Sequence, residues 1–167
     1  DAAGIQTLVA DEAGCCGAIR LHLNDHEGGL ADMRRNIDAW WPTVSAGKGE
    51  AIVMNASGCG VTVKEYGHAL AHDPAYADKA RRIGELTQDL SEFLSGLVPV
   101  LKSKVQRRRV TQLAFHPPCS LQHGQQLRGG VEAILDALGF DVKLATSDAH
   151  LCCGSAGTYS VLQAPLA

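Results

Sequence analysis

The chain has 167 residues, of which 46% are hydrophobic and 20% are charged, and its formal net charge is −3. This composition provides enough apolar material for a folded core, which excludes an intrinsically disordered chain, and the negative charge argues against a nucleic-acid-binding protein. The sequence holds no run of about 18 apolar residues, so it predicts no membrane-spanning helix.

Strands, cysteine-containing turns and helices alternate along the first half of the chain. The apolar residues 7–10 predict a short strand that ends just before a Cys-Cys-Gly turn, and a short helix is expected after that turn. A second helix, with apolar residues at helical spacing, follows a glycine-rich break and is expected to end at Pro42. Residues 51–55 form a continuous apolar run typical of a buried parallel strand, which leads into Cys59 and another helix.

The second half of the chain repeats this plan. Residues 75 to about 104 show a long helical pattern in two pieces, and strands are predicted at residues 111–116 and 141–145. Between these strands, a helix is expected from about residue 122 to residue 138. The succession of strand, cysteine turn and helix predicts an α/β fold with mainly parallel strands flanked by helices, and with cysteines at the carboxyl ends of the strands.

All six cysteines lie in turns that contain glycine or proline. Their density is too low for a secreted disulfide scaffold, so metal or redox chemistry in a reducing compartment is the better interpretation. A thiol at the start of a helix is stabilised as the thiolate, the form that a soft metal requires as its ligand. The long spacings exclude compact sites such as zinc fingers, so any site must be assembled by the fold. The candidate ligands are Cys15, Cys16, Cys59, Cys119, Cys152 and Cys153.

A single cysteine followed, one strand–helix–strand excursion later, by Cys-Cys-Gly resembles the core of the cysteine-rich, or CCG, domain family. That family includes a component of heterodisulfide reductase and iron–sulfur subunits of flavin-linked dehydrogenases, and its motif usually occurs twice. The resemblance implies two pseudo-repeated Rossmann-like lobes, with the C-terminal part of a first copy in residues 1–105 and the N-terminal part of a second copy in residues 106–167. Each copy then lacks one motif element, and the chain starts at Asp1 rather than Met, so we expect a piece of a longer protein.

The resemblance also assigns the cysteines to two groups. Cys15 and Cys16 match the second element of the first copy and Cys59 its last, so these three thiols are expected to lie close together. Cys119, Cys152 and Cys153 match the first two elements of the second copy and are expected to form the other group. Ala56 stands where some family members carry a further cysteine, which leaves Cys59 alone.

Longer stretches of the sequence are similar to the iron–sulfur subunits of glycolate oxidases (glycolate dehydrogenases), namely residues 11–18, 36–42, 55–60, 63–68, 115–125 and 152–159. The similarity implies an electron-transfer subunit of an oxidoreductase whose cysteines hold an iron–sulfur cluster of the [4Fe–4S] type. It implies flavoprotein partner subunits that carry FAD and oxidise glycolate to glyoxylate, and quinone or another electron acceptor. The implied location is the cytoplasm or the inner face of the cell membrane, and the piece alone is expected to be inactive.

Two other functions remain open on the residues alone. The chain could be a structural zinc or thiol-based assembly module, with zinc at one of the two CCG sites, or the domain itself could be catalytic, as in heterodisulfide reduction. His116 and His150, close to cysteines, are either additional ligands or hydrogen-bonded turn residues. The pair Trp40 and Trp41 either borders a docking surface or places one ring in the core and one at its rim.

Overall fold

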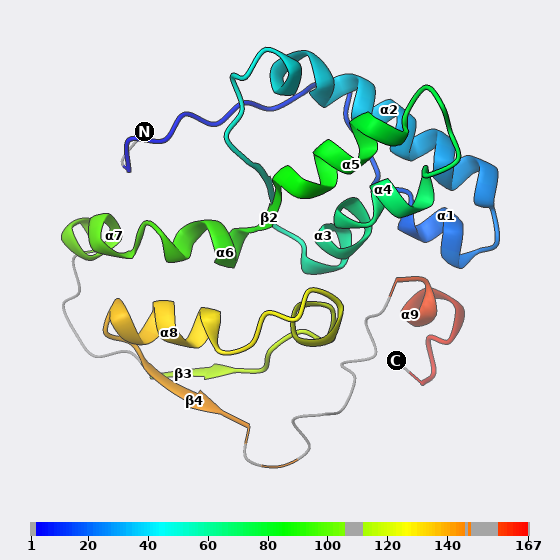
Figure 1. Ribbon diagram of the computed structural model, residues 1–167. Coiled ribbons are helices and arrows are strands. Elements are labelled where there is room, and N and C mark those ends of the chain that lie inside the picture. The colour runs from blue at the N-terminus through cyan, green and yellow to red at the C-terminus, as the bar shows by residue number, and fades with distance from the viewer. Residues whose placement is uncertain (1–2, 106–111, 146, 148–156, 167) are drawn as a thin grey trace.

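A computed structural model describes residues 3–105, 112–145, 147 and 157–166 of the chain. Helices dominate, and short strands are placed between them (Figure 1). In chain order the elements are α1 (Ala18–His22), α2 (His26–Ser45), β1 (Ile52–Met54), α3 (Ser57–Lys64), α4 (Tyr66–Ala69), α5 (Ala77–Leu86), β2 (Thr87–Asp89), α6 (Leu90–Ser95), α7 (Val98–Lys104), β3 (Gln112–Phe115), the π-helix η1 (Ser120–Gly124), α8 (Gly130–Ala137), β4 (Asp141–Leu144) and α9 (Tyr159–Leu162).

The hydrophobic core lies among α1 to α5. The long helix α2 contributes Met33 and Ile37, which lie one turn apart on its buried face, as the 3.6-residue period requires. These side chains pack with Val63 of α3 and with Ile83 of α5, all of them at most 1% exposed. Cys16 belongs to the same buried cluster, so the first cysteine turn is part of the core.

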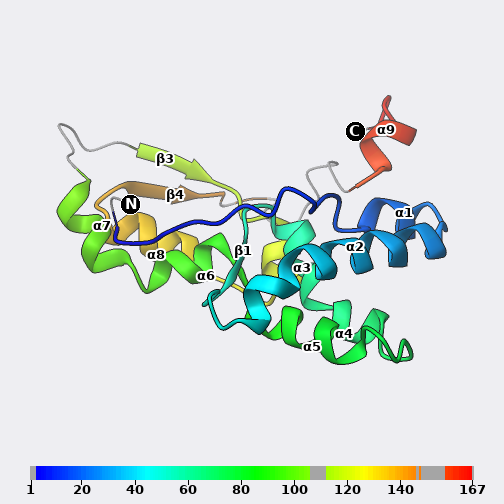
Figure 2. The ribbon, with the colours of Figure 1, turned by 90° about the horizontal axis from the view of Figure 1, so that it is seen from above.

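The described strands form two separate parallel pairs. In one pair β1 lies beside β2, with Ile52 opposite Thr87, and in the other β3 lies beside β4, with Gln112 opposite Asp141. Helix α8 packs between the β3–β4 pair and helices α6 and α7 (Figure 1), which overlap it when seen from above (Figure 2). Parallel strands joined through helices confirm the predicted α/β class in its general form.

The cysteine turns follow strands in two of the described cases. Cys59 lies just after β1 and Cys119 just after β3, as predicted. The first turn differs, because the strand expected at residues 7–10 is wrong and this segment is extended without pairing. Leu8 and Val9 are 63% and 87% exposed, so the apolar run that suggested a strand has no neighbouring strand to pair with among the described residues.

Two helical stretches also differ from expectation, at the end of α2 and within residues 75–104. Helix α2 continues past Pro42 to Ser45, so Pro42 does not end it. The pattern at residues 75–104 contains the polar strand β2, after which Asp89 and Glu92 form a capping box that starts α6.

The helix expected from residue 122 to residue 138 is divided into η1 and α8. Gln126 and Gly129 adopt left-handed backbone angles, with φ of 59° and 74°, and these interrupt the helical hydrogen-bond ladder. Gly139, with φ of 82°, follows the end of α8, which confirms the predicted stop. Within the described part of the chain, no helix combines the length and apolarity needed to cross a membrane.

Candidate metal centre

The first cysteine turn depends on glycine for its shape. Gly17 has a φ of +92°, a conformation that other residues rarely adopt. A Cβ atom at this position would lie only 2.7 Å from the carbonyl oxygen of Gly29 in α2. Gly17 therefore allows both the sharp turn after Cys16 and the close packing of α1 on α2, which brings Cys16 against the core.

Two buried side chains hold the backbone of this turn. The Asn36 side chain accepts a hydrogen bond from the Gly14 amide (2.8 Å) and donates to the Cys15 carbonyl (2.9 Å). The Tyr66 hydroxyl donates to the Cys16 carbonyl (3.0 Å) and accepts from Asn36 (3.1 Å). Asn36 and Tyr66 are both fully buried, with 0% exposure. We call these two residues the turn clamp.

A charged group on α2 supports the same turn from outside the core. Arg35 donates to the Cys15 carbonyl (3.1 Å) and to the Asp32 carboxylate (2.7 Å). Asp32 is only 7% exposed, and Arg20 of α1 pairs with its second oxygen at 3.1 Å. Two arginines thus compensate the buried carboxylate, as a desolvated charge requires.

The two adjacent thiols of the turn face different surroundings. Cys16 is 5% exposed, whereas Cys15 is exposed to solvent. Cys59, which is half-buried in the first turn of α3, packs against the buried cluster that contains Cys16, and the two thiols interact electrostatically. Two residues far apart in the sequence therefore form a thiol pair in the fold.

The environment of Cys16 favours the neutral thiol in the absence of a metal. Burial, followed by the hydrogen bond and charge of Cys59 and the charge of Cys15, raises the pKa of Cys16 to about 11, against a smaller opposing effect of the backbone at Ala18. The expected stabilisation of the thiolate by a helix start is therefore outweighed at Cys16, which precedes a helix of only five residues. A metal bound here would have to displace the thiol proton.

The described residues contain this thiol pair but no complete ligand set. Among them, no group of three or more histidine, cysteine or acidic side chains is arranged to hold a metal ion. Cys152, Cys153 and His150 lie outside the described residues, so the expected grouping of the second copy stays a prediction. A pair of facing thiols fits a soft metal or an iron–sulfur cluster as part of its ligand set.

Cys119 lies in a second turn that docks against α3. The hydroxyls of Ser57 and Ser120 are 2.6 Å apart, and the Gln125 amide donates to the Ser57 carbonyl at 2.9 Å. The same amide donates to the buried carboxylate of Asp89 at 3.1 Å. The turn that carries Cys119 therefore lies beside the start of the helix that carries Cys59, although the two were assigned to different copies.

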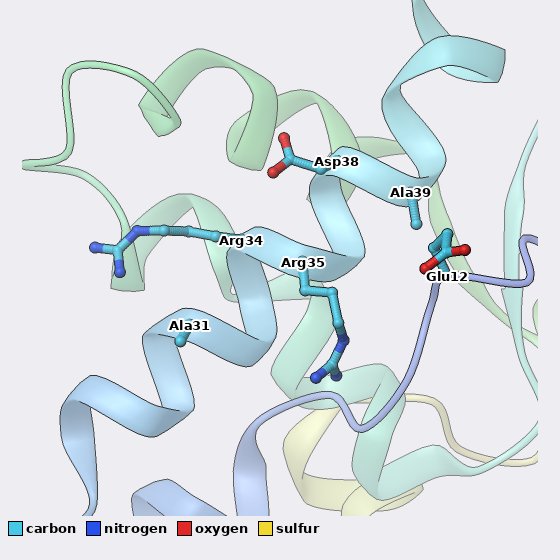
Figure 3. Close-up of a pocket in the computed structure, with 6 residues that line it drawn as sticks. All are labelled: Glu12, Ala31, Arg34, Arg35, Asp38 and Ala39. Carbon is cyan, nitrogen blue, oxygen red and sulfur yellow. The ribbon is translucent and has the colours of Figure 1, made fainter.

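A groove of about 520 Å³ lies along α2 beside the extended segment before the first cysteine turn (Figure 3). Arg34 and Arg35 leave α2 in different directions there, and each is already paired, Arg34 with Asp73 at 2.8 Å and Arg35 with Asp32. With both cations engaged, the groove offers no clear anion site. Its lining residues are Glu12, Ala31, Arg34, Arg35, Asp38 and Ala39.

The residues that hold the turns lie outside the cysteine motifs. Asn36 interrupts the apolar face of α2 next to Ile37, and a polar residue at such a position is the signal that could have revealed it. Tyr66 is equally buried, and its place in an apolar pattern marks it only as a core residue. The structure places Trp40 against the core, stacked on Tyr66 with ring centroids 6.5 Å apart, and Trp41 beside Lys79. This agrees with one indole in the core and one at its rim.

Comparison with known proteins gives related sequences. The model of the family described as CCG, Cysteine-rich domain, matches residues 1–64 and 113–167. The chain is 53% identical over its full length to the glycolate oxidase iron-sulfur subunit of Escherichia coli K12, of which it covers 40%.

More distant relatives show lower identity. The chain is 28% identical to the probable glycolate oxidase iron-sulfur subunit of Bacillus subtilis, over 96% of this chain and 35% of that protein. It is 29% identical to lactate utilization protein A of Bacillus licheniformis, over 88% of this chain and 58% of that protein. The chain thus spans less than two thirds of these relatives, and no solved structure matches it significantly.

Proposed function

Because the chain belongs to the CCG family of cysteine-rich domains, we propose that it forms part of the iron–sulfur electron-transfer subunit of a glycolate oxidase (glycolate dehydrogenase). In the proposed complex, glycolate is oxidised to glyoxylate on a flavoprotein subunit that carries FAD. The electrons then leave through this subunit to an acceptor such as quinone. The complex would work in the cytoplasm or at the inner face of the cell membrane.

The observation that carries the proposal is the thiol pair of Cys16 and Cys59. The fold packs a half-buried thiol, Cys59, against the buried cluster that contains Cys16, although the two residues come from separate parts of the chain. No disulfide joins them, and all four cysteines of the described part are free. Facing thiols without a disulfide supply the type of donor that iron–sulfur clusters use.

The cysteines would serve as ligands in two groups. Cys15, Cys16 and Cys59 would contribute to a first site, and Cys119, Cys152 and Cys153 to a second. A cluster bound there, expected to be of the [4Fe–4S] type, would supply one-electron transfer. The chain's own contribution is to hold the thiols in place and to release their protons on binding.

Two copies of the family motif account for this division. The two separate segments that match the same family model support a first copy within residues 1–105 and a second within residues 106–167. The two parallel strand pairs, one in each of these ranges, support two Rossmann-like lobes.

The proposal is tested on the natural full-length protein, purified without oxygen together with its flavoprotein partners. Iron and acid-labile sulfide are measured first, and glycolate-dependent flavin reduction and quinone reduction are then followed separately. Stoichiometric iron and sulfide with both half-reactions present supports the proposal. Zinc in place of iron, with no electron transfer to quinone, would overturn it in favour of a structural thiol module.

A further inference from the structure

The turn clamp accounts for a feature that the amino-acid sequence of the turn does not explain. Cys15 and Cys16 are neighbours, yet Cys16 is 5% exposed and faces Cys59, whereas Cys15 is open to solvent. Neighbouring side chains are kept in such different surroundings only if the peptide between them is held in one orientation. The turn lies outside any helix or strand, so regular backbone hydrogen bonds do not fix it.

Side chains from elsewhere in the fold provide that fixation. Asn36 contacts the amide of Gly14 and the carbonyl of Cys15, and Tyr66 contacts the carbonyl of Cys16. Three successive residues of the turn are thus each held through a backbone group. Because Asn36 and Tyr66 also bond to each other, a rotation of the Cys15–Cys16 peptide would break several hydrogen bonds at once.

The clamp residues are more polar than packing alone requires. Both are at 0% exposure among apolar side chains, where an unpaired amide or hydroxyl would be costly. An apolar residue could fill the position of Asn36 on the buried face of α2 without that cost. The polar atoms are instead used almost entirely on the cysteine turn, and outer hydrogen bonds of this kind orient metal ligands.

We propose that Asn36 and Tyr66 are positioning residues that fix the Cys15–Cys16 peptide, so that Cys16 is presented to Cys59 before any metal binds. This inference rests on the proposed role of Cys16 as a ligand, but the positioning itself is a property of the metal-free protein. The hydrogen bonds of the clamp to the two cysteines are made to their backbone carbonyls. The clamp acts through the backbone of the two cysteines.

The test compares Tyr66→Phe and Asn36→Ala with a matched control in the natural full-length protein. Thr87→Val is the control, because Thr87 is 4% exposed and its buried hydroxyl donates to the Ile83 carbonyl at 2.7 Å rather than to the cysteine turn. Alkylation of each cysteine in metal-free protein is followed by mass spectrometry. Urea unfolding gives the stability of every variant, so that a change in alkylation rate can be separated from a general loss of stability.

In the parent protein Cys15 should react quickly and Cys16 slowly. In both clamp variants the rate at Cys16 should rise roughly tenfold, the change expected when one or two hydrogen bonds that hold the turn are lost. The control should leave the Cys16 rate nearly unchanged. Equal rates at Cys16 in the clamp variants and the control would overturn the inference.

Loaded protein gives a second readout that separates this inference from the proposed function. If iron binds, the electron paramagnetic resonance signal and the midpoint potential should shift in the clamp variants and not in the control. If the clamp variants bind iron and keep the parent's signal, midpoint potential and alkylation rate at Cys16, the clamp inference is wrong and the proposed function stands. If the parent protein binds no iron, but Cys16 is alkylated faster in the clamp variants than in the control, the clamp inference is supported and the proposed function is wrong.

Discussion

Two of the described cysteine turns, at Cys15–Cys16 and at Cys119, are held by different means. The first, at Cys15 and Cys16, is fixed through its own backbone by buried side chains of α2 and α4. The second, at Cys119, is attached at Ser120 and Gln125 to the start of α3. The first turn is thus embedded in the core, and the second depends on a contact between elements. The comparison predicts that substitutions will affect the two turns separately.

The largest expected effect is at Cys153, and it tests whether the second group of cysteines holds iron as the first group is proposed to do. Cys153→Ser in the natural full-length protein should lower bound iron and abolish glycolate-dependent quinone reduction, because a ligand contributes both charge and a metal bond. Flavin reduction by glycolate in the partner subunit should survive. Iron content and the two half-reactions, measured side by side, check this. Normal iron content and normal quinone reduction in this variant would mean that Cys153 is a turn residue and not a ligand.

Gly17→Ala should damage the first turn by distorting its backbone. A left-handed conformation in a residue other than glycine costs about 1–3 kcal/mol, and the close contact with Gly29 adds to this. The matched control is Gly47→Ala, where φ is +65° but nothing lies within 4 Å of the added Cβ. Urea unfolding should show the larger loss for Gly17→Ala. Equal losses would mean that the close packing of α1 on α2 is unimportant.

Gln125→Ala should weaken the second turn and leave the first intact. It removes hydrogen bonds to Ser57 and Asp89, with an expected loss of about 1–2 kcal/mol in the free energy of unfolding. The alkylation rate of Cys119 should rise, while that of Cys16 stays as in the parent. A matching rise at Cys16 would show that the two turns are not independent.

The smallest effect concerns the partly buried ion pair between Arg34 of α2 and Asp73, which lies in the loop after α4. The hydrogen bond from Arg34 lowers the pKa of Asp73, so the pair contributes stability above the ordinary carboxyl pKa of 3.8 and loses it as the pH falls through the lowered value. Asp73→Asn should therefore reduce the acid sensitivity of urea unfolding, compared at pH values above and below that pKa. Asp78→Asn, which removes a carboxylate from an exposed pair with Arg81, is the matched control. An unaltered pH dependence in Asp73→Asn would contradict the pairing.

Much of the fold could be predicted because short apolar runs mark β1 and β3, and apolar residues that alternate with charged ones mark β4. Strand β2 could not be found in this way, since Thr87, Gln88 and Asp89 are polar and lie within a helical pattern. The Asp-x-x-Glu cap at Asp89 was a local signal for the start of α6. The apolar run at residues 7–10 shows the opposite error, because a strand needs a partner that a local pattern does not reveal.

The cysteines could be selected by type and spacing, but the groups that hold them could not. Asn36 and Tyr66 act on Cys15 and Cys16 from distant parts of the chain, through backbone atoms that every residue possesses. Nothing in the sequence near the cysteines encodes those contacts. The raised pKa of Cys16 was missed for a related reason, since burial by the fold outweighs the local effect of a helix start.

The most direct test of the central claim is the iron content of Cys16→Ser, Cys59→Ser and the double variant, each prepared as natural full-length protein without oxygen. If both thiols are ligands of one iron–sulfur site, each single variant should lose the same paramagnetic signal, and the double variant should lose no more than either single one. Separate signals lost by the two single variants, with both lost in the double variant, would contradict a shared site, as would full iron content in all three.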